Sequence, residues 1–219
     1  MKKIVTFLVV LLCAYGSMAQ ENDKQIATRL VKEKAGAIGL SEEAVNNSVI
    51  TGSYIIPGSD IRMVYLQQTH LGIPVYNKLH VLAFKNGAPV SVAGERVADA
   101  ATMSRSANAV ANITASAALR NAMSELKVRS LAVIPEVVPK DEQGKFRFGQ
   151  LGFSIENISA ELVWLPVEPT NELKLAWQVF MAPYSEEDYW LMNIDAKTGA
   201  FISKQSLTVK CNWDGEAHT

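Results

Sequence analysis

The chain has 219 residues, of which 48% are hydrophobic, 20% are charged and 8% are aromatic. This is the composition of a globular protein, and it excludes the collagen-like, disordered and disulfide-scaffold classes. The 21 Lys and Arg residues nearly balance 22 Asp and Glu residues, so the chain has no basic surplus with which to bind nucleic acid. The length allows one sizeable domain or two small ones.

The N-terminus has the pattern of a secretory signal peptide. Lys2 and Lys3 form a positively charged start, an apolar run follows over 4–12, and small residues precede a cleavage site between Ala19 and Gln20. The apolar run is too short to span about 30 Å of hydrocarbon as a helix. We therefore expect a secreted or periplasmic protein with no membrane segment after cleavage. The short Lys-Lys signal is typical of bacteria.

The first half of the mature chain predicts helix followed by an antiparallel meander. Apolar residues at spacings of three and four over 21–47 indicate helices, and Ser41 is placed to cap a short one. Four strands are then expected, at 53–56, 61–68, 75–84 and 90–96. The Asn86-Gly87 pair readily adopts positive φ values, so it predicts a tight hairpin turn between the last two strands.

The second half repeats this order. The segment 98–112 is rich in Ala, Ser, Asn and Thr and is the predicted linker, and 113–126 is expected to be an amphipathic helix capped by Thr114. Five further strands are predicted, at 131–138, 160–167, 173–181, 189–194 and 201–209. The sequence thus predicts an α+β fold of two successive units, each a helix followed by an antiparallel sheet.

Residues with the chemistry for catalysis are sparse. The three histidines are His70, His80 and His218, and the sequence contains no H-E-x-x-H or C-x-x-C metal signature. We interpret His70, at a strand end, and His80, within a strand, as structural residues. We therefore expect no enzymatic activity, no metal site and no cofactor in this chain.

Two other groups of residues have competing interpretations. The acidic run 186–188 is interpreted as a solvated loop in preference to a calcium site, because it lacks the spaced oxygen ligands of a calcium loop. Trp164, Trp177 and Trp190 fall in predicted strands and are interpreted as core residues in preference to a ligand-stacking row.

Signal cleavage would leave one cysteine, because Cys13 lies in the signal peptide and Cys211 near the other end. The mature chain would then close no internal disulfide, so its stability would depend on packing. Three states of Cys211 remain open: an unpaired surface thiol, half of a disulfide with a partner chain, or a thiolate that caps a protease zinc.

The stretch 65–96 resembles a known propeptide module. The motif positions are His70, Gly72, Ile73, Pro74, Val75 and Tyr76, followed by Asn86 and Gly87. Their order resembles the propeptide module, or FTP domain, of fungalysin and thermolysin zymogens, which would occupy 20–97. The physical reading agrees, because Gly72 permits a turn and Pro74 cannot donate to a strand ladder.

The second half resembles a PepSY-type module, another propeptide element of these peptidases. The resemblance rests on a helix start at 114–119, a strand at 175–179 and a hairpin at 193–200 with the pattern D-A-x-T-G. This module would occupy 113–209. Together the two modules resemble the prosegment of a fungalysin-type zinc metallopeptidase.

This resemblance implies a secreted prosegment that assists the folding of a metallopeptidase domain and inhibits it until proteolysis removes the prosegment. The partner would be that catalytic domain, in cis or in trans, and it would hold the zinc and lie after Thr219. The tail 210–219 is the candidate for a segment facing the protease, through Cys211, Asn212, Trp213 and Asp214. Two alternatives stay open: a truncated or partial zymogen, and a stand-alone envelope binding module of the same fold.

Overall fold

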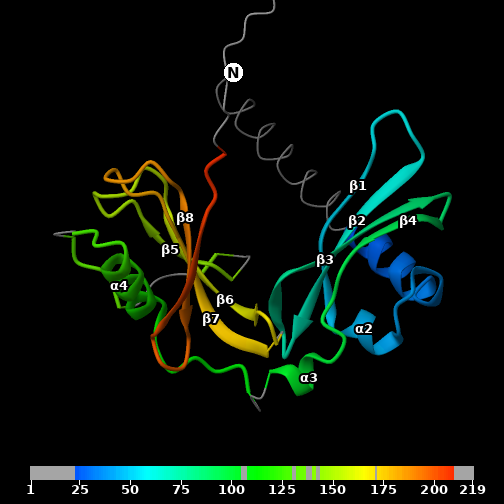
Figure 1. The fold of residues 1–219 in the computed structure, drawn as a ribbon. Coiled ribbons are helices and arrows are strands. Elements are labelled where there is room, and N and C mark those ends of the chain that lie inside the picture. Colours follow the sequence, from blue (N-terminus) through cyan, green and yellow to red (C-terminus); the bar gives the residue numbers. More distant parts are fainter. Residues whose placement is uncertain are drawn as a thin grey trace, which may run out of the picture. The chain divides into compact units, whose positions relative to one another are not determined.

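A computed structural model describes residues 23–104, 108–129, 132–136, 140–141, 144–170 and 172–209. The chain divides into two compact units, Met1–Met103 and Ser104–Thr219. Each unit combines helix with antiparallel sheet (Figure 1). The predicted α+β class is therefore confirmed.

Unit 1 begins with helical segments. A helix covers 23–33, and the 3-10 turn η1 (Gly36–Ile38) and helix α2 (Glu42–Asn46) follow it. Ser41 caps α2, because its Oγ accepts a hydrogen bond from the backbone N–H of Ala44 at 3.0 Å. This cap was predicted from the sequence and is confirmed.

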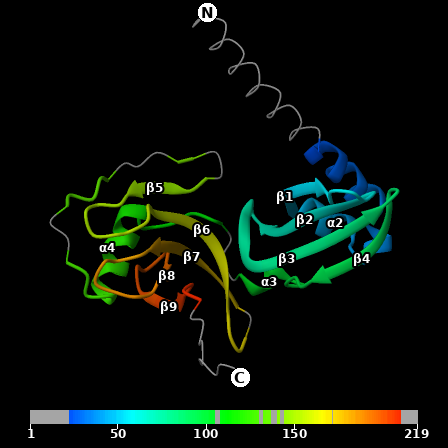
Figure 2. The ribbon, with the colours of Figure 1, turned by 90° about the horizontal axis from the view of Figure 1, so that it is seen from above.

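Four strands complete unit 1, in the spatial order β1-β2-β3-β4 (Figure 2). They are β1 (Ser48–Ile55), β2 (Ile61–His70), β3 (Ile73–Lys85) and β4 (Ala88–Gly94). Strand β1 starts well before the expected residue 53. A bulge between Ile50 and Gly52 shifts its register, and this break in alternation hides the strand from a periodicity argument.

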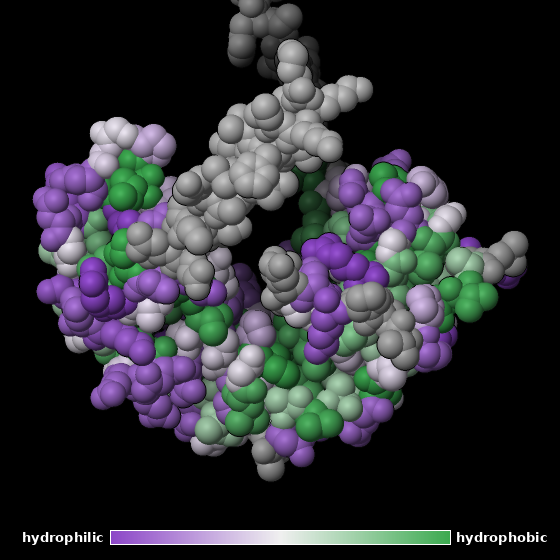
Figure 3. All heavy atoms as spheres, turned by 180° about the vertical axis from the view of Figure 1, so that it is seen from behind, coloured by the Kyte–Doolittle hydropathy of each residue, from purple (hydrophilic) through white to green (hydrophobic). Residues whose placement is uncertain are grey.

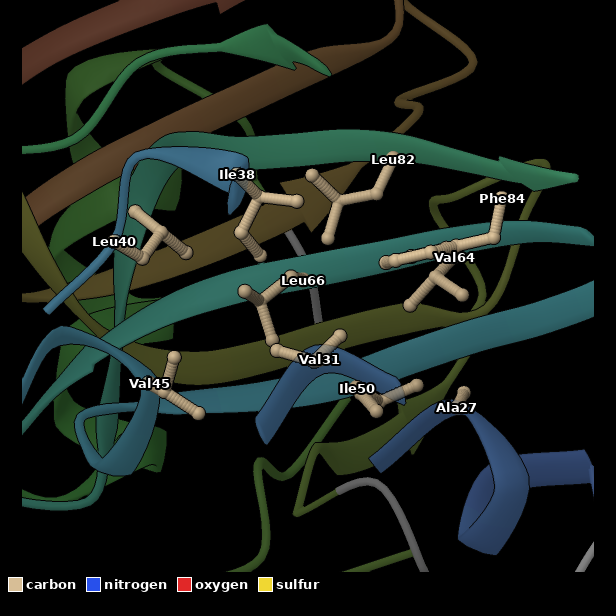
Figure 4. Close-up of a cluster of buried hydrophobic side chains, with 10 residues drawn as sticks. All are labelled: Ala27, Val31, Ile38, Leu40, Val45, Ile50, Val64, Leu66, Leu82 and Phe84. Atoms are coloured by element: carbon tan, nitrogen blue, oxygen red, sulfur yellow. The ribbon is translucent and has the colours of Figure 1, made fainter. Parts of the chain in front are cut away.

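One face of this sheet packs against the helices through a single apolar cluster (Figure 4). Its members are Ala27, Val31, Ile38, Leu40, Val45, Ile50, Val64, Leu66, Leu82 and Phe84. At one end of the sheet Arg62 joins the helix 23–33 to β1, since its Nη1 donates to Asp23 Oδ1 at 2.8 Å and to Ser53 Oγ at 3.0 Å. The helices are thus held mainly by burial of apolar surface.

Two tight turns connect β2, β3 and β4. Leu71 and Gly72 have φ values of 49° and 77°, and Asn86 and Gly87 have the same pair of values. Positive φ at both central residues defines the type I′ turn, which matches the twist of the flanking strands. The hairpin predicted at Asn86-Gly87 is confirmed.

Helix α3 (Ala100–Met103) lies inside the segment that composition marks as a linker. Asp99 Oδ1 accepts a hydrogen bond from the backbone N–H of Thr102 at 3.2 Å. The residues from 98 to 112 are therefore not wholly irregular.

Unit 2 packs helix α4 (Ala115–Glu125) on one face of a second antiparallel sheet. The strands run in the order β5 (Phe146–Gly149), β6 (Ile158–Val167), β7 (Glu172–Met181), β8 (Trp190–Asp195) and β9 (Phe201–Ser206). Thr114 Oγ1 accepts from Ala117 N at 3.1 Å, so the predicted cap of this helix is also confirmed.

The strand predicted at 131–138 is wrong for the residues described there. Residues 132–136 are irregular. Pro135 has no N–H to give to a ladder, and its carbonyl oxygen accepts a hydrogen bond from Ser116 Oγ on α4 instead. The strand that pairs with β6 on the side away from β7 is β5, a four-residue segment that the sequence pattern does not reveal.

Side-chain hydrogen bonds hold α4 just before its start and near its middle. The Trp177 indole Nε1 donates to Ile113 O, just before the helix, at 3.0 Å. Asn121 Nδ2 donates to Gly199 O in the β8–β9 turn at 2.8 Å. That turn keeps its own shape because Asp195 Oδ1 accepts from the backbone N–H groups that follow it.

The tryptophans of unit 2 differ in burial. Trp164 and Trp177 are 0% and 4% exposed, which confirms that they are core residues. Trp190 is half-buried, and Lys204 Nζ lies 4.5 Å from the centre of its ring.

The buried polar groups on the other face of the β7–β9 strands are paired. Gln178 Nε2 donates to Asn193 Oδ1 at 3.2 Å, and Asn193 Nδ2 donates to Ser203 Oγ at 3.0 Å. These contacts offset the cost of removing the amides from water.

Candidate functional site

A pocket of about 120 Å³ lies within unit 1, where the end of β2 meets α2 and the segment after β4. Its charged and polar lining includes Glu43, Asn47, His70, Arg96 and Asp99. These side chains come from three segments that are distant in sequence, so the fold is what brings them together.

Hydrogen bonds fix the walls of this pocket. Gln68 is 2% exposed, and its side-chain amide makes a reciprocal pair with the backbone of Val97: Nε2 donates to Val97 O, and Oε1 accepts from Val97 N, both at 2.8 Å. The backbone N–H of Thr69 donates to Asn47 O at 2.9 Å. The segment after β4 and the end of α2 are therefore both tied to β2.

Arg96 is the cation of the pocket. Arg96 is half-buried, and its Nη1 donates to Ala44 O at 3.3 Å. Burial lowers the pKa of Arg96, and the negative charge of Glu43 opposes that shift. The guanidinium has five N–H donors, so this single contact leaves it capable of further hydrogen bonds.

Both described histidines lie near this cation. Burial lowers the pKa of His70, which lines the pocket. The pKa of His80, within β3, is lowered first by burial and then by the charge of Arg96. Both imidazoles are therefore predominantly neutral at pH 7.

Most residues that carry the propeptide resemblance are turn and strand residues. Gly72 lies in the β2–β3 turn and Asn86-Gly87 in the β3–β4 turn, while Ile73, Pro74, Val75 and Tyr76 form the start of β3. Of these motif positions, His70 lines the pocket.

A glutamine supports the motif from the neighbouring strand. Strand β3 bulges over 75–78, where Asn77 has a φ of 57°. Gln67 Nε2 fills this bulge, donating to Val75 O at 2.7 Å and to Lys78 O at 3.0 Å. The side chain thereby pairs carbonyl groups that the bulge removes from the ladder.

Sequence reasoning missed Arg96, Glu43 and the two adjacent glutamines, Gln67 and Gln68. A signal was present for the glutamines, because two amides at the end of an apolar strand need hydrogen-bond partners when buried. Arg96 gave no such signal, since its setting depends on the long-range approach of α2.

Exposed apolar side chains offer a second candidate surface. The rings of Tyr54 and Tyr65 stack with their centroids 6.2 Å apart, and their hydroxyl oxygens lie 3.4 Å apart. Tyr54 is 45% exposed, and its hydrogen bond with Tyr65 raises the pKa of Tyr54. The face drawn in Figure 3 shows small hydrophobic groups interspersed with hydrophilic residues.

Several predicted positions lie outside the described residues. They are the signal cleavage site Ala19-Gln20 and the tail residues Cys211, Asn212, Trp213 and Asp214. The acidic run 186–188 is described, and it lies in the connection between β7 and β8 with Glu186 and Glu187 exposed.

The described part of the chain contains no group of three or more His, Cys, Asp or Glu residues that could hold a metal ion. Within that same part, no helix is both long enough and apolar enough to cross a membrane.

The chain has a distant structural similarity to known proteins. No protein-family model and no curated protein matches the sequence. Among solved structures, the chain is similar to the Bacillus megaterium YpeB C-terminal domain, with a TM-score of 0.36 and 12% sequence identity. The match covers 84% of this chain and 65% of that chain.

Proposed function

We propose that this chain is a secreted prosegment that assists the folding of a fungalysin-type zinc metallopeptidase domain and inhibits it by non-covalent binding. The observation that carries the proposal is the use of the motif residues in unit 1. Gly72, Pro74 and the Asn86-Gly87 pair shape one continuous meander, stiffened by the Gln67 side chain. A meander fixed in this way would give a rigid surface for binding a peptidase domain, which supports the proposal.

Binding by such a surface would depend on a few apolar anchors. Residues 20–219 lack Lys2 and Lys3, so their formal net charge is 19 − 22 = −3, which is small for a chain of this length and offers little electrostatic attraction. Tyrosine is enriched among the residues that dominate binding energy, and Tyr54 presents a stacked, exposed ring on a strand. We therefore assign Tyr54 a place in the peptidase contact.

Inhibition is tested by titrating purified residues 20–219 against a fungalysin-type catalytic domain that hydrolyses a peptide substrate. We expect a saturable loss of activity, and Tyr54→Ala should weaken inhibition by about tenfold. Tyr184→Ala is the matched control, because Tyr184 is 64% exposed but lies in unit 2. Unchanged proteolysis at micromolar concentrations would contradict the proposal.

Assistance to folding has a separate readout. The catalytic domain is denatured and then refolded with and without residues 20–219, and recovered activity is measured after the prosegment is digested away. A higher yield with the prosegment is expected. Equal yields would contradict the folding role. They would not bear on inhibition, which the titration tests separately.

A second candidate function is a stand-alone binding module of the cell envelope. The observation that favours it is the polar pocket, which unit 1 forms entirely from its own residues. A ligand bound there without any peptidase would support this candidate.

A further inference from the structure

We propose that the pocket of unit 1 binds a carboxylate on a narrow aliphatic stem, either an acidic side chain or the C-terminus of a peptide, with Arg96 as the anchor. This inference goes beyond the prosegment function, because it requires no peptidase.

The first argument concerns the unused donors of the guanidinium. Among the described residues, Arg96 makes its one hydrogen bond to Ala44 O, at the long distance of 3.3 Å. A guanidinium removed from water without partners is costly, and a carboxylate can accept two of its parallel N–H groups at once. The half-buried Arg96 is therefore a site that an incoming carboxylate would stabilise.

The second argument concerns the charges that face Arg96. Glu43 is exposed on the first turn of α2 and acts on Arg96 through its charge. Asp99 also lines the pocket, but its Oδ1 accepts from Thr102 N at 3.2 Å, so it is engaged with α3. A ligand carboxylate would thus compete with Glu43 above all, and removing the charge of Glu43 should strengthen binding.

The third argument concerns size and rigidity. A volume of about 120 Å³ admits a carboxylate and a short stem, and it is too small for a drug-sized ligand. The Gln68–Val97 amide pair and the Thr69–Asn47 bond hold the walls in place. Little ordering is then needed on binding, which favours affinity for a small group.

The test is a nuclear magnetic resonance titration of ¹⁵N-labelled residues 20–219 at neutral pH with three probes. N-acetylaspartate α-amide carries the side-chain carboxylate, N-acetylalanine carries the C-terminal carboxylate, and N-acetylasparagine α-amide is the neutral control. We expect saturable shifts of the Arg96 side-chain Nε–H and of the Val97 backbone N–H with a carboxylate probe and not with the neutral one. The probe that binds identifies the source of the carboxylate; binding by neither, or equal binding by all three, overturns the proposal.

Two variants sharpen the titration. Arg96→Gln should weaken binding by at least about tenfold, because a charge-assisted pair is lost. Glu43→Gln should strengthen binding by about two- to fivefold, since it removes the competing charge. The matched control is Glu42→Gln, which removes the same charge from an exposed neighbour on α2 that does not line the pocket.

If Arg96→Gln disturbs folding, Glu43→Gln still tests the proposal. Glu43 is exposed, so its replacement should leave the spectrum of unit 1 otherwise unchanged. Equal or weaker binding by Glu43→Gln would overturn the assignment of Arg96 as anchor. A failure of the inhibition assay would leave this outcome untouched, because no peptidase is present.

Discussion

The two units hold their helices in different ways. In unit 1 the helices pack through a cluster of large aliphatic side chains and Phe84, with an ion pair at one end of the sheet. In unit 2 the buried face of α4 is half alanine, comprising Ala115, Ser116, Ala118, Leu119, Ala122 and Met123. Small side chains bury little surface and interlock weakly. The hydrogen bonds from Trp177 and Asn121 therefore position α4 on its sheet, whereas in unit 1 the packing of large apolar side chains positions the helices.

The units also differ in the polar groups they bury. Unit 1 has two histidines near its pocket, His70 and His80, and the charge state of an imidazole responds to pH near neutrality. The buried ladder of unit 2 is built from the neutral side chains Gln178, Asn193 and Ser203. We therefore expect the stability of unit 1, which contains the candidate pocket, to depend more on pH than the stability of unit 2.

The largest expected effect comes from the aliphatic cluster of unit 1. Leu82 is 0% exposed, so Leu82→Ala should lower the free energy of unfolding by about 2–5 kcal/mol through lost burial and a cavity. Hydrogen exchange should show the loss of protection in unit 1. Val90→Ala in β4 is the control, because Val90 is 55% exposed and its loss should cost at most about 0.5 kcal/mol. Equal effects of the two variants would contradict the packing account.

A medium effect is expected from the hydrogen bond that positions α4. Trp177→Phe keeps an aromatic ring but leaves Ile113 O without its indole donor, which should cost about 1–3 kcal/mol and speed exchange in α4. Trp190→Phe is the matched control. It should cost about 0.5–1 kcal/mol, since its main polar contact is the stacked Lys204. A larger loss for Trp190→Phe would overturn the distinction between the units.

Helix caps allow the units to be compared through one interaction. Ser41 and Thr114 accept equivalent bonds from the residue three positions on, so Ser41→Ala and Thr114→Ala should each cost about 1 kcal/mol. Denaturant unfolding measures both. Replacement by Asp, which caps equally well, should restore stability at both sites. If Ser41→Ala leaves the free energy of unfolding unchanged, packing alone fixes the five-residue helix α2.

The sequence predicted elements whose determinants are local. The caps at Ser41 and Thr114 and the Asn86-Gly87 turn depend on a few adjacent residues, and all three are present. The missed features depend on contacts between distant residues. Strand β5 exists because β6 offers it a partner, and the irregular 132–136 segment reflects Pro135 and its bond to Ser116.

The candidate site was less predictable for the same reason. His70 was singled out as a motif position and does line the pocket. Arg96 and Glu43 are distant in sequence, and no periodicity connects the end of a strand with the first turn of a helix that precedes it. Local rules therefore identified the scaffold, and long-range packing determined the pocket.

The smallest effect expected is a difference in the pH dependence of the two units. The pKa of His80 lies below its ordinary value of 6.5, chiefly because of burial and then because of Arg96. The unfolded chain consequently takes up a proton at a higher pH than the folded chain does. The contribution of His80 to the stability of unit 1 is then fully present above about pH 6.5 and is lost as the pH falls below that value.

Hydrogen exchange between about pH 7.5 and 5.5 measures this difference. Unit 1 should open more readily in acid, while the described part of unit 2, which contains no histidine, should change less. His80→Gln should flatten the response of unit 1, because both burial and the charge of Arg96 lower the pKa of His80. His70→Gln should remove a share that reflects the burial of His70. Equal acid sensitivity of the two units, or an unchanged response in His80→Gln, would show that the buried histidines do not distinguish them.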